Sequence, residues 1–305
     1  MGRRLTDRAC TARAPGPLTV GVMRSTPLLV LLSVASAQIG AATARTLFDD
    51  LGASGVLLLR MGIAALVLGV AVRPRVAAWT PAAWRAAMLL GAFAAGLTML
   101  SYLAFRVAPQ GIVVTASFAG PLVLALVQTR RPADLLWAAL AGTGVVLLGL
   151  RTGSDVPLSG LLLALLAGAC GAGYIMFSAR LGGAVPGLGG LPVSFAVAAL
   201  LVLPFGAAGA SGVFRHPRLL AGAIAVALLA SVLPYALELI ALRTLSTRVF
   251  GVLMSLQPAA AAIAGRVILH QRLGPVPIVA LVLVSVAGVG ITRACPRQPD
   301  RPATT

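Results

Sequence analysis

Roughly ten apolar stretches, each about 18 to 22 residues long, alternate with short polar hinges between Pro27 and Thr292. A helix rises about 1.5 Å per residue and the hydrocarbon core of a bilayer is about 30 Å thick, so such a stretch is long enough to cross it. We therefore expect an all-α integral membrane protein with ten transmembrane helices. The predicted spans are residues 27–47, 54–72, 84–105, 109–128, 133–150, 158–178, 188–207, 219–242, 246–269 and 274–292.

The composition agrees with this pattern. Hydrophobic residues make up 59% of the chain and charged residues only 10%, and the mean hydropathy is +0.99. These are too few polar groups to cover the surface of a soluble domain of this size. The hinges are short, so we expect no extramembrane domain. Residues 1–26 are charged throughout and lack an apolar signal-peptide core, which predicts a disordered cytosolic tail, and residues 293–305 form a second one.

An internal repeat becomes visible when the chain is shifted by 137 positions. The shift lays Ala104-Phe105-Arg106 on Ala241-Leu242-Arg243, and Pro121 on Pro258. The predicted repeats are residues 27–150 and 158–292, with five spans each. Because five is odd, the two repeats enter the membrane in opposite senses, which is the inverted-repeat plan common among transporters. The alternative is chance coincidence in a sequence so rich in Ala, Leu and Arg.

The arginines predict the orientation of the chain. With the N-terminus in the cytosol, sixteen arginines of the hinges and tails lie inside and five lie outside. Positive charge is concentrated on the cytoplasmic side of membrane proteins, so both termini are expected there.

The charge and the reactive residues exclude several classes of function. The net charge of +17 comes from arginines dispersed over the hinges, whereas a nucleic-acid partner would need them gathered on one soluble face. The three cysteines, Cys10, Cys170 and Cys295, have no pairing or metal-ligand spacing. His216 and His270 stand in hinges without acidic or thiol neighbours. We expect no metal, no cofactor and no enzymatic activity.

Glu238 is the only carboxylate within the predicted apolar cores, and it is the first candidate site residue. Pro234 frees a backbone carbonyl one turn earlier, and Tyr235 adds a polar tip on nearly the same helix face. A carboxyl group removed from water can bind and release a proton near neutral pH, as a proton-coupling site requires. The alternative is a structural ion pair with Arg60, Arg266 or, less favourably, Arg243.

Three further polar side chains lie inside predicted spans. Arg60 is too deep to reach the interface easily, so it either binds a substrate carboxylate or donates to backbone carbonyls of a broken helix. Gln38 stands near Gly40, and Gln257 precedes Pro258. Each glutamine either contacts a small polar solute or serves as an ordinary interhelical hydrogen-bonding residue.

Three blocks of sequence carry a family resemblance. The first runs from Ser36-Ala37-Gln38 to Leu59-Arg60, the second from Gly111-Ile112 through Gly120-Pro121 to Asp134, and the third from Leu233-Pro234-Tyr235 through Glu238 to Pro258-Ala259. Together they resemble the drug/metabolite transporter superfamily with its EamA-type repeats. The resemblance implies a carrier of the bacterial inner membrane that exports small amino acids of the threonine and homoserine kind, or related metabolites, by exchange with protons.

The chain also departs from that family. Where its amino-acid exporters carry membrane glutamates, this chain has Ser117, Gln257 and His270-Gln271, and Arg266 adds a positive charge. These changes favour an anion or a neutral solute over an ammonium group. We expect a cavity between the repeats in which Arg60 and Gln38 meet the solute and Glu238 cycles a proton, with Ser117, Tyr235, Gln257 and Arg266 as further candidates. The alternatives are a drug or metabolite carrier of the same fold, a passive channel and an inactive homologue.

Overall fold

The protein is described here by a computed structural model that covers residues 17–129, 132–150, 157–185, 187–242, 245 and 247–294. Every regular element within these residues is helical, so the predicted all-α class is confirmed. The helices of the first half are α1 (Pro17–Thr46), α2 (Phe48–Val72), η1 (Val76–Ala78), α3 (Pro81–Val107), α4 (Gln110–Ser117), α5 (Ala119–Thr129) and α6 (Pro132–Leu150). Those of the second half are α7 (Leu158–Ala184), α8 (Gly190–Ala210), η2 (Ser211–Phe214), α9 (Pro217–Ala227), η3 (Leu228–Val232), α10 (Leu233–Leu242), α11 (Thr247–Met254), α12 (Gln257–Ile268) and α13 (Pro275–Ala294).

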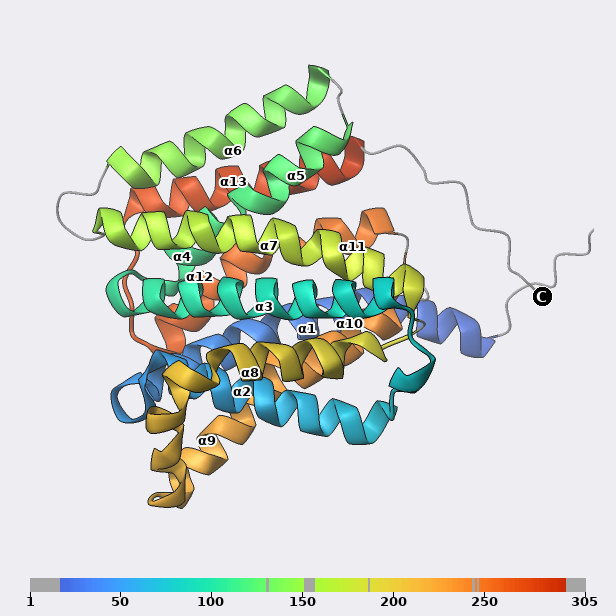
Figure 1. The fold of residues 1–305 in the computed structure, drawn as a ribbon. Helices are drawn as coiled ribbons and strands as arrows, with labels where there is room; N and C mark the ends of the chain where they lie inside the picture. Colours follow the sequence, from blue (N-terminus) through green and yellow to red (C-terminus); the bar gives the residue numbers. More distant parts are fainter. Residues whose placement is uncertain are drawn as a thin grey trace, which may run out of the picture.

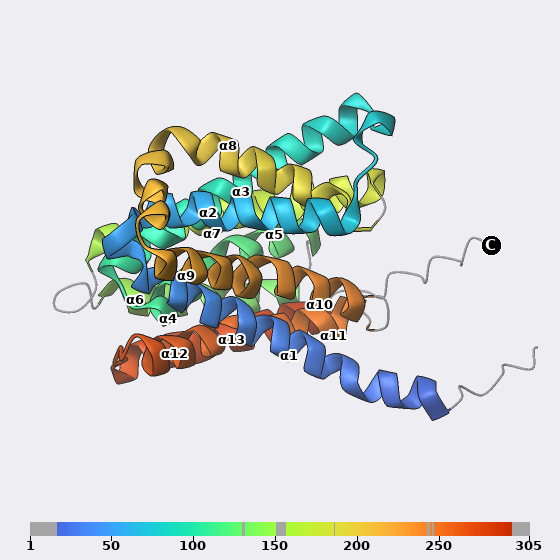
Figure 2. The ribbon, with the colours of Figure 1, turned by 90° about the horizontal axis from the view of Figure 1, so that it is seen from below.

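The long helices lie side by side in one bundle (Figures 1 and 2). The most extensive contacts join α2 to α8, α3 to α7 and α6 to α13. Within the described residues, seven helical segments are long and apolar enough to cross a membrane, and three shorter apolar helices occupy residues 110–124, 135–148 and 275–290. The chain is therefore a multi-pass membrane protein.

The first helix begins earlier than predicted. Helix α1 starts at Pro17 and continues through Pro27, so the helix extends ten residues ahead of the predicted first span. Proline suits the first turn of a helix because its missing N–H has no intrahelical partner there, and Pro17 provides such a start. Residues 1–16 and 295–305 of the two predicted tails lie outside the described residues.

Two helices are interrupted at related places. Helices α4 and α5 are separated at Phe118, shortly before Pro121, and helices α11 and α12 are separated at Ser255 and Leu256, shortly before Pro258. A proline removes one backbone donor and disfavours a helical conformation just before it, which explains both interruptions. Helices α4 and α11 are both eight residues long, and their first residues, Gln110 and Thr247, are 137 positions apart.

The bundle is apolar outside and partly polar inside. Large hydrophobic side chains such as Phe205, which is 74% exposed, cover the exterior. Many buried side chains are small, and they include a set of polar ones: Ser33, Ser36, Gln38, Thr98, Gln110, Thr115, Ser194, Ser231 and Ser255. Polar side chains in a bilayer-spanning bundle point inward because lipid offers them no hydrogen bonds. This interior polar set leads to the candidate site.

Candidate functional site

The helix that carries Glu238 is broken in its middle. A π-helical turn, η3, joins α9 to α10 immediately before Pro234. Because Pro234 has no N–H, it cannot donate to the carbonyl of Ala230, four residues earlier, or to that of Leu229, five residues earlier. Two backbone acceptors in the interior of the bundle therefore need partners from other helices.

Side chains of α1 and α2 supply these partners. Ser36 Oγ donates to the Leu229 carbonyl at 2.7 Å, and Arg60 Nη2 donates to the Ala230 carbonyl at 2.8 Å. Arg60 also donates through Nε to Ser231 Oγ at 3.0 Å and through Nη1 to Tyr102 Oη at 3.1 Å. Arg60 thus donates to a carbonyl of the broken helix, which is one of its two predicted roles.

Glu238 has a neutral partner. Ser33 Oγ of α1 donates to Glu238 Oε1 at 2.8 Å and lies 3.4 Å from the Pro234 carbonyl oxygen. The guanidinium of Arg60 is engaged with Ser231, Tyr102 and Ala230, and among the described residues no ion pair joins Glu238 to Arg60 or Arg266. The structural ion pair is thus not formed with either of these two arginines, and the third predicted partner, Arg243, lies outside the described residues.

Tyr235 lies three residues before Glu238 on α10 and contacts two helices of its own half of the chain. It accepts a hydrogen bond of 2.7 Å from Tyr174 Oη of α7, and its ring packs against Phe195 of α8 with centroids 5.4 Å apart. Glu238 contacts α1 while Tyr235 contacts α7, and these are the first helices of the two predicted repeats. The α10 segment thus connects both halves through polar groups.

Gly40 allows α1 to lie directly against the π-helical turn. A Cβ atom at this position would stand 2.7 Å from the Ala230 backbone nitrogen. We expect Gly40→Ala to force α1 away from η3 and to destabilise the fold by about 1 to 3 kcal/mol, the usual cost of overpacking. The apparent melting temperature in detergent checks this prediction. Gly62→Ala is the matched control because a Cβ there meets no atom within 4 Å, and it should leave the melting temperature unchanged or slightly higher.

A chain of three glutamines lies beside this region. Gln110 Nε2 of α4 donates to both the backbone oxygen and the side-chain Oε1 of Gln38 at 3.0 Å, and its backbone N–H donates to Gln271 Oε1 at 3.0 Å. Gln38 therefore forms an interhelical hydrogen bond, one of its two predicted roles. Gln110 was not among the predicted site residues, because it stands at the very start of the predicted span 109–128, where a polar side chain can reach the membrane surface.

The remaining candidates are dispersed. Ser117 Oγ donates to the Val114 carbonyl at 3.0 Å, and Gln257 Nε2 lies 3.2 Å from Met254 Sδ, so both bond within their own broken helices. Arg266 is exposed in the last turn of α12 and lines a pocket of about 570 Å³ with Gln271 and Arg272. Helix α12 ends only two residues after Arg266, which lets its side chain reach the surface.

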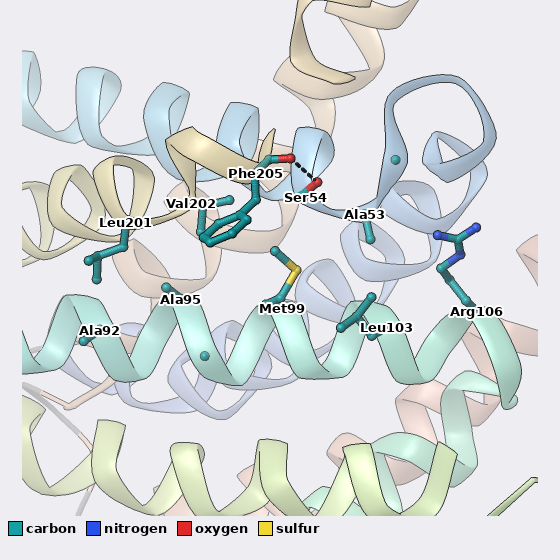
Figure 3. Close-up of a pocket in the computed structure, with 12 residues that line it drawn as sticks. Ala53, Ser54, Ala92, Ala95, Met99, Leu103, Arg106, Leu201, Val202 and Phe205 are labelled. Atoms are coloured by element: carbon teal, nitrogen blue, oxygen red, sulfur yellow. Dashed lines mark hydrogen bonds between the residues drawn. The ribbon is translucent and has the colours of Figure 1, made fainter. Parts of the chain in front are cut away.

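A larger pocket of about 620 Å³ lies between α2, α3 and α8 (Figure 3). Its lining comprises Gly52, Ala53, Ser54, Ala92, Ala95, Gly96, Met99, Leu103, Arg106, Leu201, Val202 and Phe205. Neither pocket is lined by Gln38, Arg60 or Glu238.

Comparisons with known proteins find relatives that match nearly the whole chain. Residues 158–293 match the model of the EamA-like transporter family. The threonine/homoserine exporter RhtA of Salmonella typhimurium (strain SL1344) is 39% identical over 278 residues, which are 90% of this chain and 94% of the relative. RhtA of Escherichia coli (strain K12) is 39% identical over 87% of this chain and 91% of its own length. One solved crystal structure has a TM-score of 0.57 at 17% identity, covering 88% of this chain and 97% of that chain, which shows similarity of fold alone.

Proposed function

The chain belongs to the EamA-like transporter family, and we propose on that premise that it exports small amino acids of the threonine and homoserine kind, or related metabolites, across the bacterial inner membrane in exchange for protons. The observation that carries the proposal is the match to threonine/homoserine exporters along 90% of this chain and 94% of theirs. Membership of a transporter family confirms the prediction that the chain is not an enzyme.

The proposed architecture has ten spans in two inverted repeats, with both termini in the cytoplasm. Three observations support it. The helix breaks before Pro121 and Pro258 recur at the shift of 137 positions that aligns the two halves. Contacts between α2 and α8, and between α6 and α13, join equivalent helices of the two halves. The arginines of the hinges and tails are concentrated on the side assigned to the cytoplasm.

In the proposed cycle Glu238 carries the proton. The ionised carboxylate accepts the hydrogen bond from Ser33, and protonation removes its charge from the bundle interior. The π-helical turn before Pro234 interrupts the regular hydrogen bonding of the helix, so the α9–α10 segment bends there as the repeats rock about the site. Arg60 is a positioning residue in this scheme because it holds the turn through Ala230 and Ser231.

The test is efflux from cells that express the chain. Cells loaded with labelled threonine, homoserine and a panel of other amino acids, including acidic and neutral ones, should release at least one of them saturably and faster when a proton gradient is imposed. Efflux that rises linearly without saturation would identify a passive channel instead. Release of no amino acid, with the protein verified in the membrane, would contradict the amino-acid proposal and favour a drug or other metabolite carrier.

A further inference from the structure

The larger pocket is a groove that follows the third helix. Its lining includes Ala92, Ala95, Met99, Leu103 and Arg106 of α3, which stand in a row with Ala92 at one end and Arg106 at the other (Figure 3). The row runs over 14 residue steps from Ala92 to Arg106, which is about 21 Å at 1.5 Å per residue. Half of a bilayer, headgroups included, is about 20 to 22 Å thick. The groove therefore has the length of one lipid leaflet.

The walls of the groove are apolar and open to the membrane. Leu201 and Phe205 of α8 border it and are 50% and 74% exposed. The hydroxyl of Ser54, the polar group in the wall, donates to the Phe205 carbonyl at 2.9 Å and so offers no free donor (Figure 3). Because α3 spans Pro81–Val107, Ala92 lies near the middle of the bilayer and Arg106 lies in the last turn, at its surface.

One uncompensated positive charge stands at the surface end. The neighbouring Arg45 donates to the Phe105 carbonyl and interacts electrostatically with the acidic Asp49. Arg106 is exposed, and within the described part of the chain its guanidinium makes no hydrogen bond or ion pair. The groove thus combines an apolar channel of leaflet length with a free guanidinium at the depth of the lipid phosphates.

We propose that this groove binds an acyl chain of an anionic phospholipid whose phosphate group contacts Arg106. A guanidinium forms paired, charge-assisted hydrogen bonds with phosphate oxygens. A water-soluble solute would leave the membrane-facing walls beside Phe205 without a partner, whereas an acyl chain fills them. We expect the groove to bind a lipid with a net negative headgroup more tightly than a zwitterionic lipid. Attraction between an anionic headgroup and a single basic residue near the surface is worth about a fivefold change in affinity.

Native mass spectrometry of the full chain, delipidated in detergent, tests the proposal. Phosphatidylglycerol and phosphatidylethanolamine with identical acyl chains are titrated separately, and the parent protein should bind phosphatidylglycerol about fivefold more tightly. Arg106→Gln should abolish this preference. Arg215→Gln, which removes an exposed arginine outside the groove, should retain it.

A second variant tests the apolar part and leaves the charge in place. Ala92 is exposed within the groove, so Ala92→Phe should fill the channel and weaken binding of both lipids at least fivefold. Ala169→Phe, at an exposed position of α7 outside the groove, is its matched control. The proposal is overturned if Arg106→Gln keeps the preference seen in Arg215→Gln, or if Ala92→Phe binds lipid as well as Ala169→Phe does. The result does not depend on which solute the protein exports.

Discussion

Replacing Glu238 with glutamine is expected to abolish the acceleration of efflux by a proton gradient. Glutamine has nearly the same shape and can still accept the hydrogen bond that Ser33 donates at 2.8 Å, but it cannot bind and release a proton. The variant should therefore fold normally and lose the whole gradient-dependent part of transport. Efflux of the identified solute, measured in vesicles at equal protein levels with and without the gradient, checks this result.

Ser33→Ala is the companion variant for Glu238. It removes the hydroxyl that contacts the carboxyl group and keeps the carboxyl group itself, so transport should slow but remain sensitive to the gradient. If Glu238→Gln responds to the gradient as the parent does, Glu238 is not the coupling residue. If both variants fold and lose efflux equally under all conditions, the contact between α1 and α10, rather than the proton, is what transport requires.

The parts of the site that depend on local chemistry could be predicted from the sequence. Pro234 lacks a backbone N–H, so it predicts a helix with unpaired carbonyl groups. A lone glutamate four residues later in an apolar stretch is predicted to face the interior of the bundle. The lengths of the apolar stretches likewise predicted the helical fold, because whether a segment can span the bilayer depends only on its own length and hydrophobicity. The break before Pro258 was not predicted: the sequence analysis gave one span over residues 246–269, whereas the structure has two helices there, α11 and α12.

The partners of these groups depend on tertiary contacts that no local pattern reveals. Ser33 and Glu238 are 205 positions apart, and Arg60 and Ser231 are 171 apart. A serine in an apolar span is common and carries no signal of its own, so Ser33, Ser36 and Ser231 were not predicted. For Arg60 the sequence left two roles open, and the Ala230 carbonyl that it contacts lies 170 positions away.

Arg60→Met should be the most destabilising substitution in this region. It leaves the Ala230 carbonyl, the Ser231 hydroxyl and the Tyr102 hydroxyl without their donor, and each unsatisfied buried polar group costs about 1 to 3 kcal/mol. We expect a total loss of about 3 kcal/mol or more, visible as a large fall in the apparent melting temperature in detergent. Arg85→Met, which removes an exposed arginine from α3, should leave that temperature nearly unchanged.

The physical cause assigned to Arg60 can be isolated with Pro234→Ala. This substitution restores a backbone N–H that can donate to the Ala230 carbonyl, so the helix no longer needs the guanidinium there. In a double-mutant cycle, Arg60→Met should cost about 1 kcal/mol less in the Pro234→Ala background than in the parent protein. Equal costs in the two backgrounds would mean that Arg60 is required for Ser231, Tyr102 or a solute, and not for the broken helix. Any role of Arg60 that does not involve the Ala230 carbonyl contributes equally in both backgrounds and cancels in the cycle. The difference therefore reports only the hydrogen bond from Arg60 to that carbonyl.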